Sequence, residues 1–306
     1  MSLAWVAGSV RARLLLGRRL DADATRQLGR SESLAGALAL LSGTTYAEAA
    51  GTDSLEQAQR AVAARLVLQL RVLAAWLPRG GADAVRALAG WFELVNVEDR
   101  LAYLAGGPLQ PPFQLGILSS IWETAARTQS AAELRAVLGA SSWGDPGGDE
   151  AQDIHAALRL GWARRVGVRV PEARAWAAGA AAILLAEELF LSRQRPHPTL
   201  VRRADLGSDW ADARSVAELR SRLPRRAAWA LAHVTEPAEL WQAELAWWRT
   251  VAAEAEALVR SRRDGRDVIV GAVVLLGLDA LRVTTALAVA ASPPSSASQE
   301  VLDALC

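Results

Sequence analysis

Three aspartates close together in the chain are the residues that could most directly perform chemistry. Asp205, Asp209 and Asp212 surround Trp210, and carboxylate oxygens are the ligands that Mg²⁺ prefers. One hypothesis is therefore an all-helical metal-dependent enzyme in which these side chains hold the ion. The alternative is a solvated turn whose acidic residues favour the N-terminus of a helix beginning near Ser215. We prefer this second interpretation.

Other catalytic patterns are absent from the sequence. The glycine pairs lack the lysine of a phosphate-binding loop, because the chain contains no lysine at all. His155, His197 and His233 are isolated, with no second ligand at helical or zinc-finger spacing. There is also no Gly-x-Ser-x-Gly nucleophile elbow. We therefore predict no catalytic residue, no cofactor and no metal.

Composition and charge indicate an ordinary folded protein. The chain has 306 residues, of which 52% are hydrophobic and 22% charged, and its formal net charge is +1. This balance gives no long-range field that would attract nucleic acid, so we expect no nucleic-acid partner. The single cysteine, Cys306, excludes a disulfide framework and agrees with a reducing cytoplasm.

Two apolar stretches are long enough to require a test against the membrane. The first, 173–190, contains Arg174, Glu187 and Glu188, and the second, 268–291, has Asp279 and Arg282 near its middle. Two central charges would cost about 5–7 kcal/mol on insertion, so we predict a buried helix rather than a membrane span. The N-terminus has no basic segment ahead of its apolar run, and we expect no secretory signal there.

The hydrophobic pattern predicts an all-helical fold. Alternating Val, Ile and Thr runs are nearly absent, whereas Ala, Leu, Arg and Glu are frequent. Helix starts are indicated by Ser or Thr followed three residues later by Glu or Gln, the capping-box pattern. Four sites have this form: Thr45, Ser54, Ser130 and Ser215.

A repeated segment indicates the internal organisation. Residues 33–46, SLAGALALLSGTTY, resemble residues 130–143, SAAELRAVLGASSW, and residues 215–223 begin a third copy that departs at Pro224. The copies start about a hundred residues apart, a period too long for tetratricopeptide or HEAT repeats. We predict three similar helical units, at 1–107, 108–205 and 206–306, the first ending with the helix 91–104.

The only asparagine of the chain, Asn96, lies in this predicted helix 91–104. Asparagine is not favoured inside helices, so its presence there requires a structural reason. Buried polar groups are usually hydrogen-bonded. We therefore predict that Asn96 is buried and bonded to a neighbouring backbone segment or to an arginine such as Arg100.

Together these features resemble the central-stalk protein that joins the axle to the membrane ring in rotary V-type and A-type ATPases, prokaryotic and eukaryotic. Four stretches carry the resemblance: Ser9-Val-Arg-Ala-Arg-Leu-Leu15, the helix and turn from Leu34 to Tyr46, Asn96 with Glu93 and Arg100, and Leu278-Asp-Ala-Leu-Arg282. The middle unit lacks an asparagine after its Glu187-Glu188 pair, unlike the family pattern.

The resemblance implies a fold and a role. The three units would surround a pseudo-threefold axis and form a funnel, peripheral to the cytoplasmic face of the cell membrane. The chain would be a non-catalytic structural subunit without a cofactor. It would couple the rotating axle subunits to the membrane proteolipid ring for proton or sodium transport. Asn96, Arg100, Asp279 and Arg282 would brace the units. The alternatives are an all-helical scaffold or adaptor protein with other partners and the metal-dependent enzyme.

Overall fold

The chain folds into α-helices throughout the part that the structure describes. A computed structural model describes residues 3–192, 198–199, 204–261, 264–293 and 296–306. Helices account for 74% of these described residues, which contain 14 α-helices and no strand, and this confirms the all-helical class. The arrangement of three units about an axis stays a prediction, as do the unit boundaries after residues 107 and 205. His197 lies outside the described residues.

The chain divides into two compact units, and the first combines both ends of the sequence. Unit 1 contains residues Met1–Val85 and Trp248–Cys306, and unit 2 contains Arg86–Trp247, so the boundaries fall within helices α5 (Arg79–Leu104) and α13 (Leu240–Val259). The remaining helices of unit 1 are α1 (Leu3–Leu16), α2 (Ala22–Gly29), α3 (Leu34–Leu40), α4 (Leu55–Ala75), α14 (Arg266–Ala291) and α15 (Ser296–Leu305).

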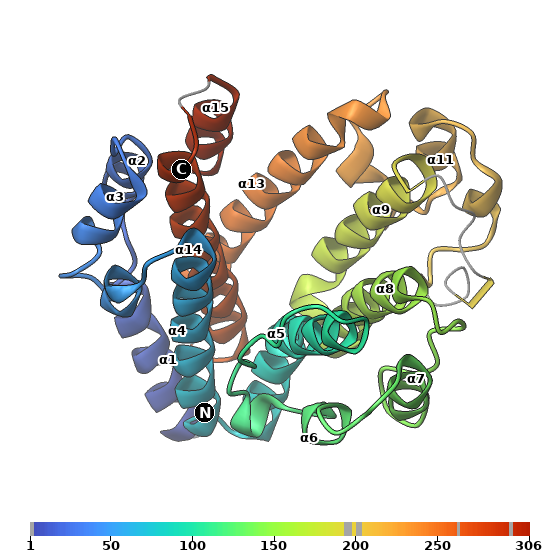
Figure 1. Ribbon diagram of the computed structural model, residues 1–306, viewed down its shortest axis with the longest axis horizontal. Coiled ribbons are helices and arrows are strands. Elements are labelled where there is room, and N and C mark those ends of the chain that lie inside the picture. The colour runs from blue at the N-terminus through green and yellow to red at the C-terminus, as the bar shows by residue number, and fades with distance from the viewer. Residues whose placement is uncertain (1–2, 193–197, 200–203, 262–263, 294–295) are drawn as a thin grey trace. The chain divides into compact units, whose positions relative to one another are not determined.

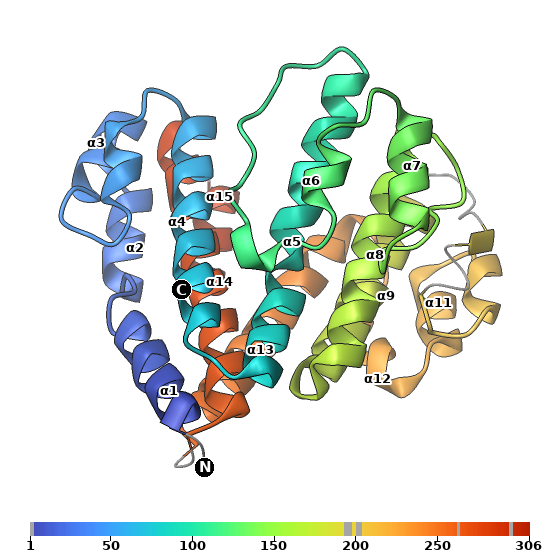
Figure 2. The ribbon, with the colours of Figure 1, turned by 90° about the horizontal axis from the view of Figure 1, so that it is seen from below.

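Helix α14 is the central helix of unit 1. It packs against α1, α2, α3, α4 and α15 (Figures 1 and 2). By length and composition it is the one helix of the described residues that could cross a membrane, yet 67% of its most apolar stretch is buried within the protein. The prediction of a buried helix over 268–291 is thus confirmed. Its apolar sequence is explained by neighbours on several sides.

Unit 2 is built around two antiparallel helices that follow each other in the chain, α8 and α9 (Figure 2). Its other helices are short and cover these two and the second part of α5. Trp210 is fully buried in the core that α9 forms with the last short helices. The helices of unit 2 are α6 (Trp122–Ala125), α7 (Ala131–Gly139), α8 (Ala151–Arg169), α9 (Arg174–Phe190), α11 (Val216–Arg222) and α12 (Arg225–Ala228).

Three of the four predicted capping sites begin α-helices. The hydroxyl oxygens of Ser54, Ser130 and Ser215 accept hydrogen bonds from the backbone N–H groups of Gln57, Glu133 and Glu218, each at 3.2 Å. These bonds satisfy N–H groups that have no partner within their helix. The prediction was wrong for Thr45, which precedes a 3₁₀ helix (Ala47–Gly51) without a side-chain cap. Its hydroxyl instead accepts a hydrogen bond from Gln69 on α4.

The first two copies of the repeated segment end in the same turn. After α3, the hydroxyl of Thr44 donates to the carbonyl of Leu41 and accepts from the N–H of Tyr46. After α7, Ser141 makes the corresponding bonds to the carbonyl of Leu138 and the N–H of Trp143. The likeness of the two segments therefore extends from sequence to hydrogen bonding. Each turn directs an aromatic side chain, Tyr46 or Trp143, into a core.

Two glycines of α14 provide a test of how closely this helix packs. A Cβ atom at Gly271 would lie 2.5 Å from the carbonyl oxygen of Ala255 on α13, whereas one at Gly277 would meet no atom within 4 Å. We expect Gly271→Ala to lower the free energy of unfolding by about 1–3 kcal/mol, because backbone atoms must move. Gly277→Ala should raise it by up to about 1 kcal/mol, since alanine favours a helix. Urea unfolding of both variants checks this, and equal effects would contradict it.

Candidate functional site: two buried carboxylates on long helices

Glu93 on α5 is a buried carboxylate that ties three segments of unit 2 together. Glu93 is only 1% exposed. Its oxygens accept hydrogen bonds from six donors: the N–H groups of Ser120 (2.6 Å), Ile121 (2.8 Å) and Trp122 (3.1 Å), the hydroxyls of Ser119 (3.1 Å) and Ser120, and the indole N–H of Trp143 (3.2 Å). Helix α6 begins at Trp122, so Glu93 satisfies N–H groups that no helical carbonyl can reach.

Asp279 on α14 is the corresponding buried carboxylate of unit 1, and it accepts hydrogen bonds from fewer donors. It is 1% exposed. Its Oδ1 accepts from the N–H of Leu20 at 3.1 Å, just before α2, and its Oδ2 accepts from the hydroxyl of Tyr46 at 2.7 Å. Asp279 therefore joins the central helix to the start of α2 and to the turn after α3. The residues it joins are more than 230 positions away in the sequence.

The two carboxylate sites share one arrangement. In each site, the carboxylate of a long helix accepts a hydrogen bond from a backbone N–H group near the start of one short helix. It accepts another from an aromatic side chain that follows the next short helix in the chain. The aromatic residues, Tyr46 and Trp143, occupy equivalent positions of the repeat. In the third copy the corresponding position is Ala228, whose side chain has no hydrogen-bond donor. The nearby indoles of Trp210 and Trp229 donate to the backbone carbonyls of Gly207 and Arg226 instead.

Sequence reasoning missed these aromatic partners, although the sequence contains a signal for them. The repeat identifies Tyr46 and Trp143 as the aromatic ends of two copies, but not as hydrogen-bond donors to buried acids. The sequence indicated Glu93 only because the family resemblance implies an acidic residue at this position. An aromatic residue with a polar group at equivalent positions of two copies was the available signal, because a buried tyrosine or tryptophan usually requires an acceptor.

Electrostatics distinguish the two carboxylates. Burial raises the pKa of Glu93, but the hydrogen bonds from Ser120, Ile121 and Trp122 outweigh this effect, and its pKa lies below the ordinary value. Burial raises the pKa of Asp279 to about 6, although the bond from Tyr46 and the charge of Arg19 oppose the rise. The difference follows from the number of donors, since each donated hydrogen bond favours the ionised form.

An arginine stacks on the aromatic partner of Glu93. The guanidinium of Arg165 on α8 lies 4.2 Å from the ring centre of Trp143. Two of its nitrogens are buried without a hydrogen-bond partner, and burial lowers the pKa of Arg165 while the charge of Glu93 raises it. The cation is thus held by the ring and by the nearby carboxylate rather than by a direct ion pair.

Asn96 is fully buried and bonded to backbone, as the sequence predicts. Its side-chain oxygen accepts from the N–H of Phe113 at 2.7 Å, and its side-chain NH₂ donates to the carbonyl of the same residue at 3.0 Å. It therefore fixes the extended segment after α5. Arg100 does not take part, because its guanidinium donates to the carbonyl of Thr128. Asn96 and Arg100 therefore bind different segments.

Arg282 also binds a backbone group outside its own helix. Its Nε donates to the carbonyl of Leu305 at 2.5 Å, near the end of α15, and burial lowers its pKa. Asp279 and Arg282 therefore hold different segments against α14, although they lie three residues apart. Asn96 and Arg100 similarly hold two different segments against α5. Whether these contacts transmit force between units stays a prediction.

The three aspartates considered for metal binding are not gathered into a site. Asp205 has a left-handed backbone (φ 52°) and lies 4.0 Å from the guanidinium of Arg226. Asp209 accepts from the hydroxyl of Ser208, and with Asp212 it belongs to a short 3₁₀ helix (Asp209–Asp212). In the described segments, no group of three or more His, Cys, Asp or Glu side chains is placed to hold a metal ion. This geometry gives the enzyme hypothesis no support.

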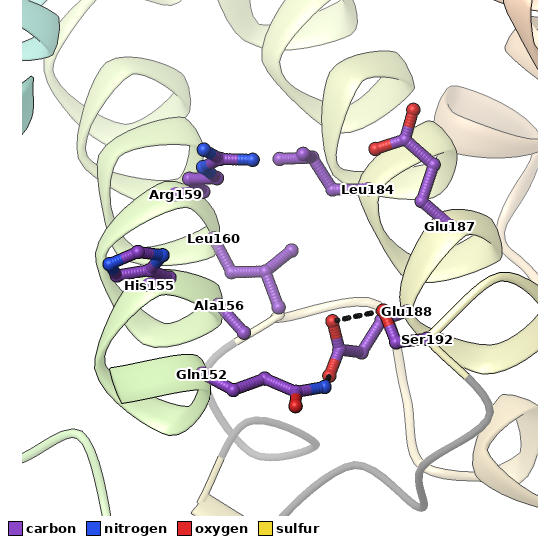
Figure 3. A pocket seen from close by; sticks show the side chains of 9 residues that line it. All are labelled: Gln152, His155, Ala156, Arg159, Leu160, Leu184, Glu187, Glu188 and Ser192. Carbon is purple, nitrogen blue, oxygen red and sulfur yellow. Dashed lines mark hydrogen bonds between the residues drawn. The ribbon is translucent and has the colours of Figure 1, made fainter. Parts of the chain in front are cut away.

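A pocket of about 460 Å³ lies between α8 and α9 (Figure 3). Glu188 accepts hydrogen bonds from Gln152 at 3.2 Å and Ser192 at 3.4 Å, and Arg159 donates to Glu98 at 3.1 Å. Burial, followed by the charge of Glu244, raises the pKa of Glu187. His155 lines the same pocket, and His233 is exposed elsewhere. Gln152, Glu188 and Ser192 are thus bonded to one another and Arg159 to a residue outside the lining, an arrangement that identifies no ligand.

Comparison with known proteins adds no assignment, because no protein-family model matches the chain and no curated protein matches it significantly.

Asn96→Leu tests the importance of the bond to Phe113. The substitution removes both hydrogen bonds between the side chain of Asn96 and the backbone of Phe113, and the loss of a buried hydrogen-bond partner costs about 1–3 kcal/mol. We expect a lower melting temperature and a loss of about 2–4 kcal/mol in the free energy of unfolding. Ala102→Leu, at an exposed position of the same helix, is the control and should change little. An unchanged melting temperature for Asn96→Leu would refute the bracing role.

The two carboxylates should give opposite pH dependences of stability. Because the pKa of Asp279 is raised in the folded protein, its ionisation lowers stability as pH rises from about 4 to about 6. The stability difference between the native protein and Asp279→Asn should fall by about 1–3 kcal/mol over this window and then remain constant. Glu93 has a lowered pKa, so its contribution is present above about pH 4.5 and is lost as pH falls.

Denaturant unfolding followed by tryptophan fluorescence measures both differences, using Asp279→Asn and Glu93→Gln at a series of pH values. Each variant serves as the control for the other, because both remove one buried charge from a long helix. The expected slopes have opposite signs. A flat difference for Asp279→Asn between pH 4 and 6 would show that this carboxylate is not perturbed.

Proposed function

We propose that the chain is a non-catalytic central-stalk subunit of a rotary V-type or A-type ATPase. In this role it would couple the rotating axle to the membrane proteolipid ring and so drive proton or sodium transport. It would lie peripherally on the cytoplasmic face of the membrane and need no cofactor. The Glu93 and Asp279 sites, which repeat one arrangement in two units, are the observation that favours this proposal most.

The repeated carboxylate sites support a chain built by multiplication of one helical element. Tyr46 and Trp143 end equivalent turns and donate to acids on long helices. Ser130 and Ser215 cap equivalent helices in the second and third copies, as Ser33 does in the first. The family that the sequence resembles consists of three such units. The third copy of this chain keeps the cap but not the aromatic donor.

The same sites suit a mechanical role. Moving one charge across 100 mV requires about 2.3 kcal/mol, so a step that moves several ions transmits on the order of 10 kcal/mol through the stalk. A protein under such a load requires stiff joints between its elements. Buried, hydrogen-bonded carboxylates provide directional joints of this kind, because releasing a donor leaves a polar group unsatisfied in the core.

Purification from the native cell tests the proposal. The tagged chain is isolated from membranes in mild detergent, and co-purifying proteins are identified by mass spectrometry. We expect a proteolipid together with large ATP-binding subunits, and membranes from cells lacking the chain should lose ATP-driven ion transport while soluble ATPase activity persists. Cells that express the untagged chain are the control.

Recovery of the chain alone from the soluble fraction would overturn the proposal. Recovery with a constant set of other proteins would favour the scaffold or adaptor alternative. Magnesium-dependent activity of the isolated chain that is lost on replacing Asp205, Asp209 and Asp212 by alanine would favour the enzyme.

A further inference from the structure

Helix α1 carries exposed apolar side chains on the face opposite to its buried face. The exposed residues are Leu3 (87%), Val6 (37%), Val10 (50%) and Leu14 (64%). At 3.6 residues per turn these four side chains fall within about 80° of one another around the helix. We call them the α1 stripe. It runs almost the full length of the helix, so it is a continuous surface rather than a set of isolated exposed residues.

The opposite face of α1 is firmly packed, so the outward direction of the stripe is fixed. Gly8, Ser9 and Ala12 are buried there. The hydroxyl of Ser9 accepts from the N–H of Gly265, and Arg13 forms a 2.5 Å ion pair with Asp264. A helix at the surface of a soluble protein normally has polar residues opposite its buried face. An apolar stripe in that position indicates that another surface covers it.

The charges that α1 and the turn after it contribute are all positive. Residues 1–20 contain four arginines and no acidic residue, and one of the four, Arg13, is paired with Asp264. Arg11 lies over the ring of Trp76, itself 53% exposed, with 5.1 Å between guanidinium and ring centre. Arg18 is exposed just beyond the helix and forms no ion pair with the described residues. A second copy of α1 would bring arginine against arginine, so the charges favour an anionic partner.

We propose that the α1 stripe docks on an anionic lipid surface, with the helix lying in the plane of the membrane interface. Helices that bind there present Leu, Phe or Trp to the acyl boundary and Arg or Lys to the phosphates, and exposed tryptophan is enriched at the same depth. The stripe is a single ridge and fits a deformable surface without a matching groove. The inference goes beyond the proposed function, because a stalk protein could contact its ring through protein surfaces alone.

Vesicle binding tests this surface with the full-length purified chain. Flotation is measured with phosphatidylcholine vesicles with and without about 30% phosphatidylglycerol. We expect binding to the anionic vesicles that weakens with salt. Val10→Glu/Leu14→Glu should reduce it roughly tenfold or more, and Arg18→Glu should reduce it several-fold. Val168→Glu, at a 64% exposed apolar position on α8, is the matched control and should bind as the native chain does.

A labelling experiment avoids charge substitutions that could disturb folding. In a Cys306→Ser background, Leu14→Cys or Val168→Cys carries an environment-sensitive fluorophore. We expect a blue shift on adding anionic vesicles only for the label at position 14. No binding by the native chain, or unchanged binding by Val10→Glu/Leu14→Glu, would overturn the proposal. So would stripe-dependent self-association or capture of an acidic protein without vesicle binding. Co-purification with the ATPase subunits is scored separately, so either proposal can fail alone.

Discussion

The structure depends on the burial of carboxylates whose charge must be satisfied inside a helical protein. A buried, unpaired carboxylate is costly, and each of the two described above is satisfied by donors from segments outside its own helix. Glu93 uses N–H groups at the start of α6, and Asp279 uses the N–H that precedes α2. Because the first N–H groups of a helix have no partner within it, Glu93 and the start of α6 stabilise each other, and Asp279 holds the segment that leads into α2. This mutual requirement fixes how short helices attach to long ones.

The two carboxylate sites have the same arrangement but different electrostatic properties. Six hydrogen bonds hold Glu93 ionised, whereas Asp279 has two donors and a pKa of about 6. Unit 2 therefore has a joint that does not change protonation near neutral pH, and unit 1 has one that can. For a protein proposed to work beside an ion-conducting ring, this difference would make unit 1 the more sensitive to local acidity. The exposed stripe of α1 belongs to the same unit.

How far the sequence predicts the site can be judged from particular residues. The serine caps were predictable, because their side chains bond to N–H groups three residues away. The burial of Asn96 was predictable from its residue type and its place in an apolar helix. Its partner, Phe113, was not, because a backbone group in an irregular segment has no sequence signature. Thr45 fitted the capping pattern but is bound by Gln69 from another helix, since a local pattern does not reveal competing long-range donors.

The sequence by itself determined the helical class, the repeated segment with its capped helices, and the buried character of the helix containing Asp279. These properties depend on contacts within a few residues, where composition and spacing are sufficient. Only the tertiary structure decided that the last long helix packs against the first four helices. It also decided that the side chains of Tyr46 and Trp143 donate hydrogen bonds to buried carboxylates. The Tyr46–Asp279 bond joins residues 233 positions apart. Such pairs form because a buried charge needs donors from any part of the chain, a requirement without a period or motif in the sequence.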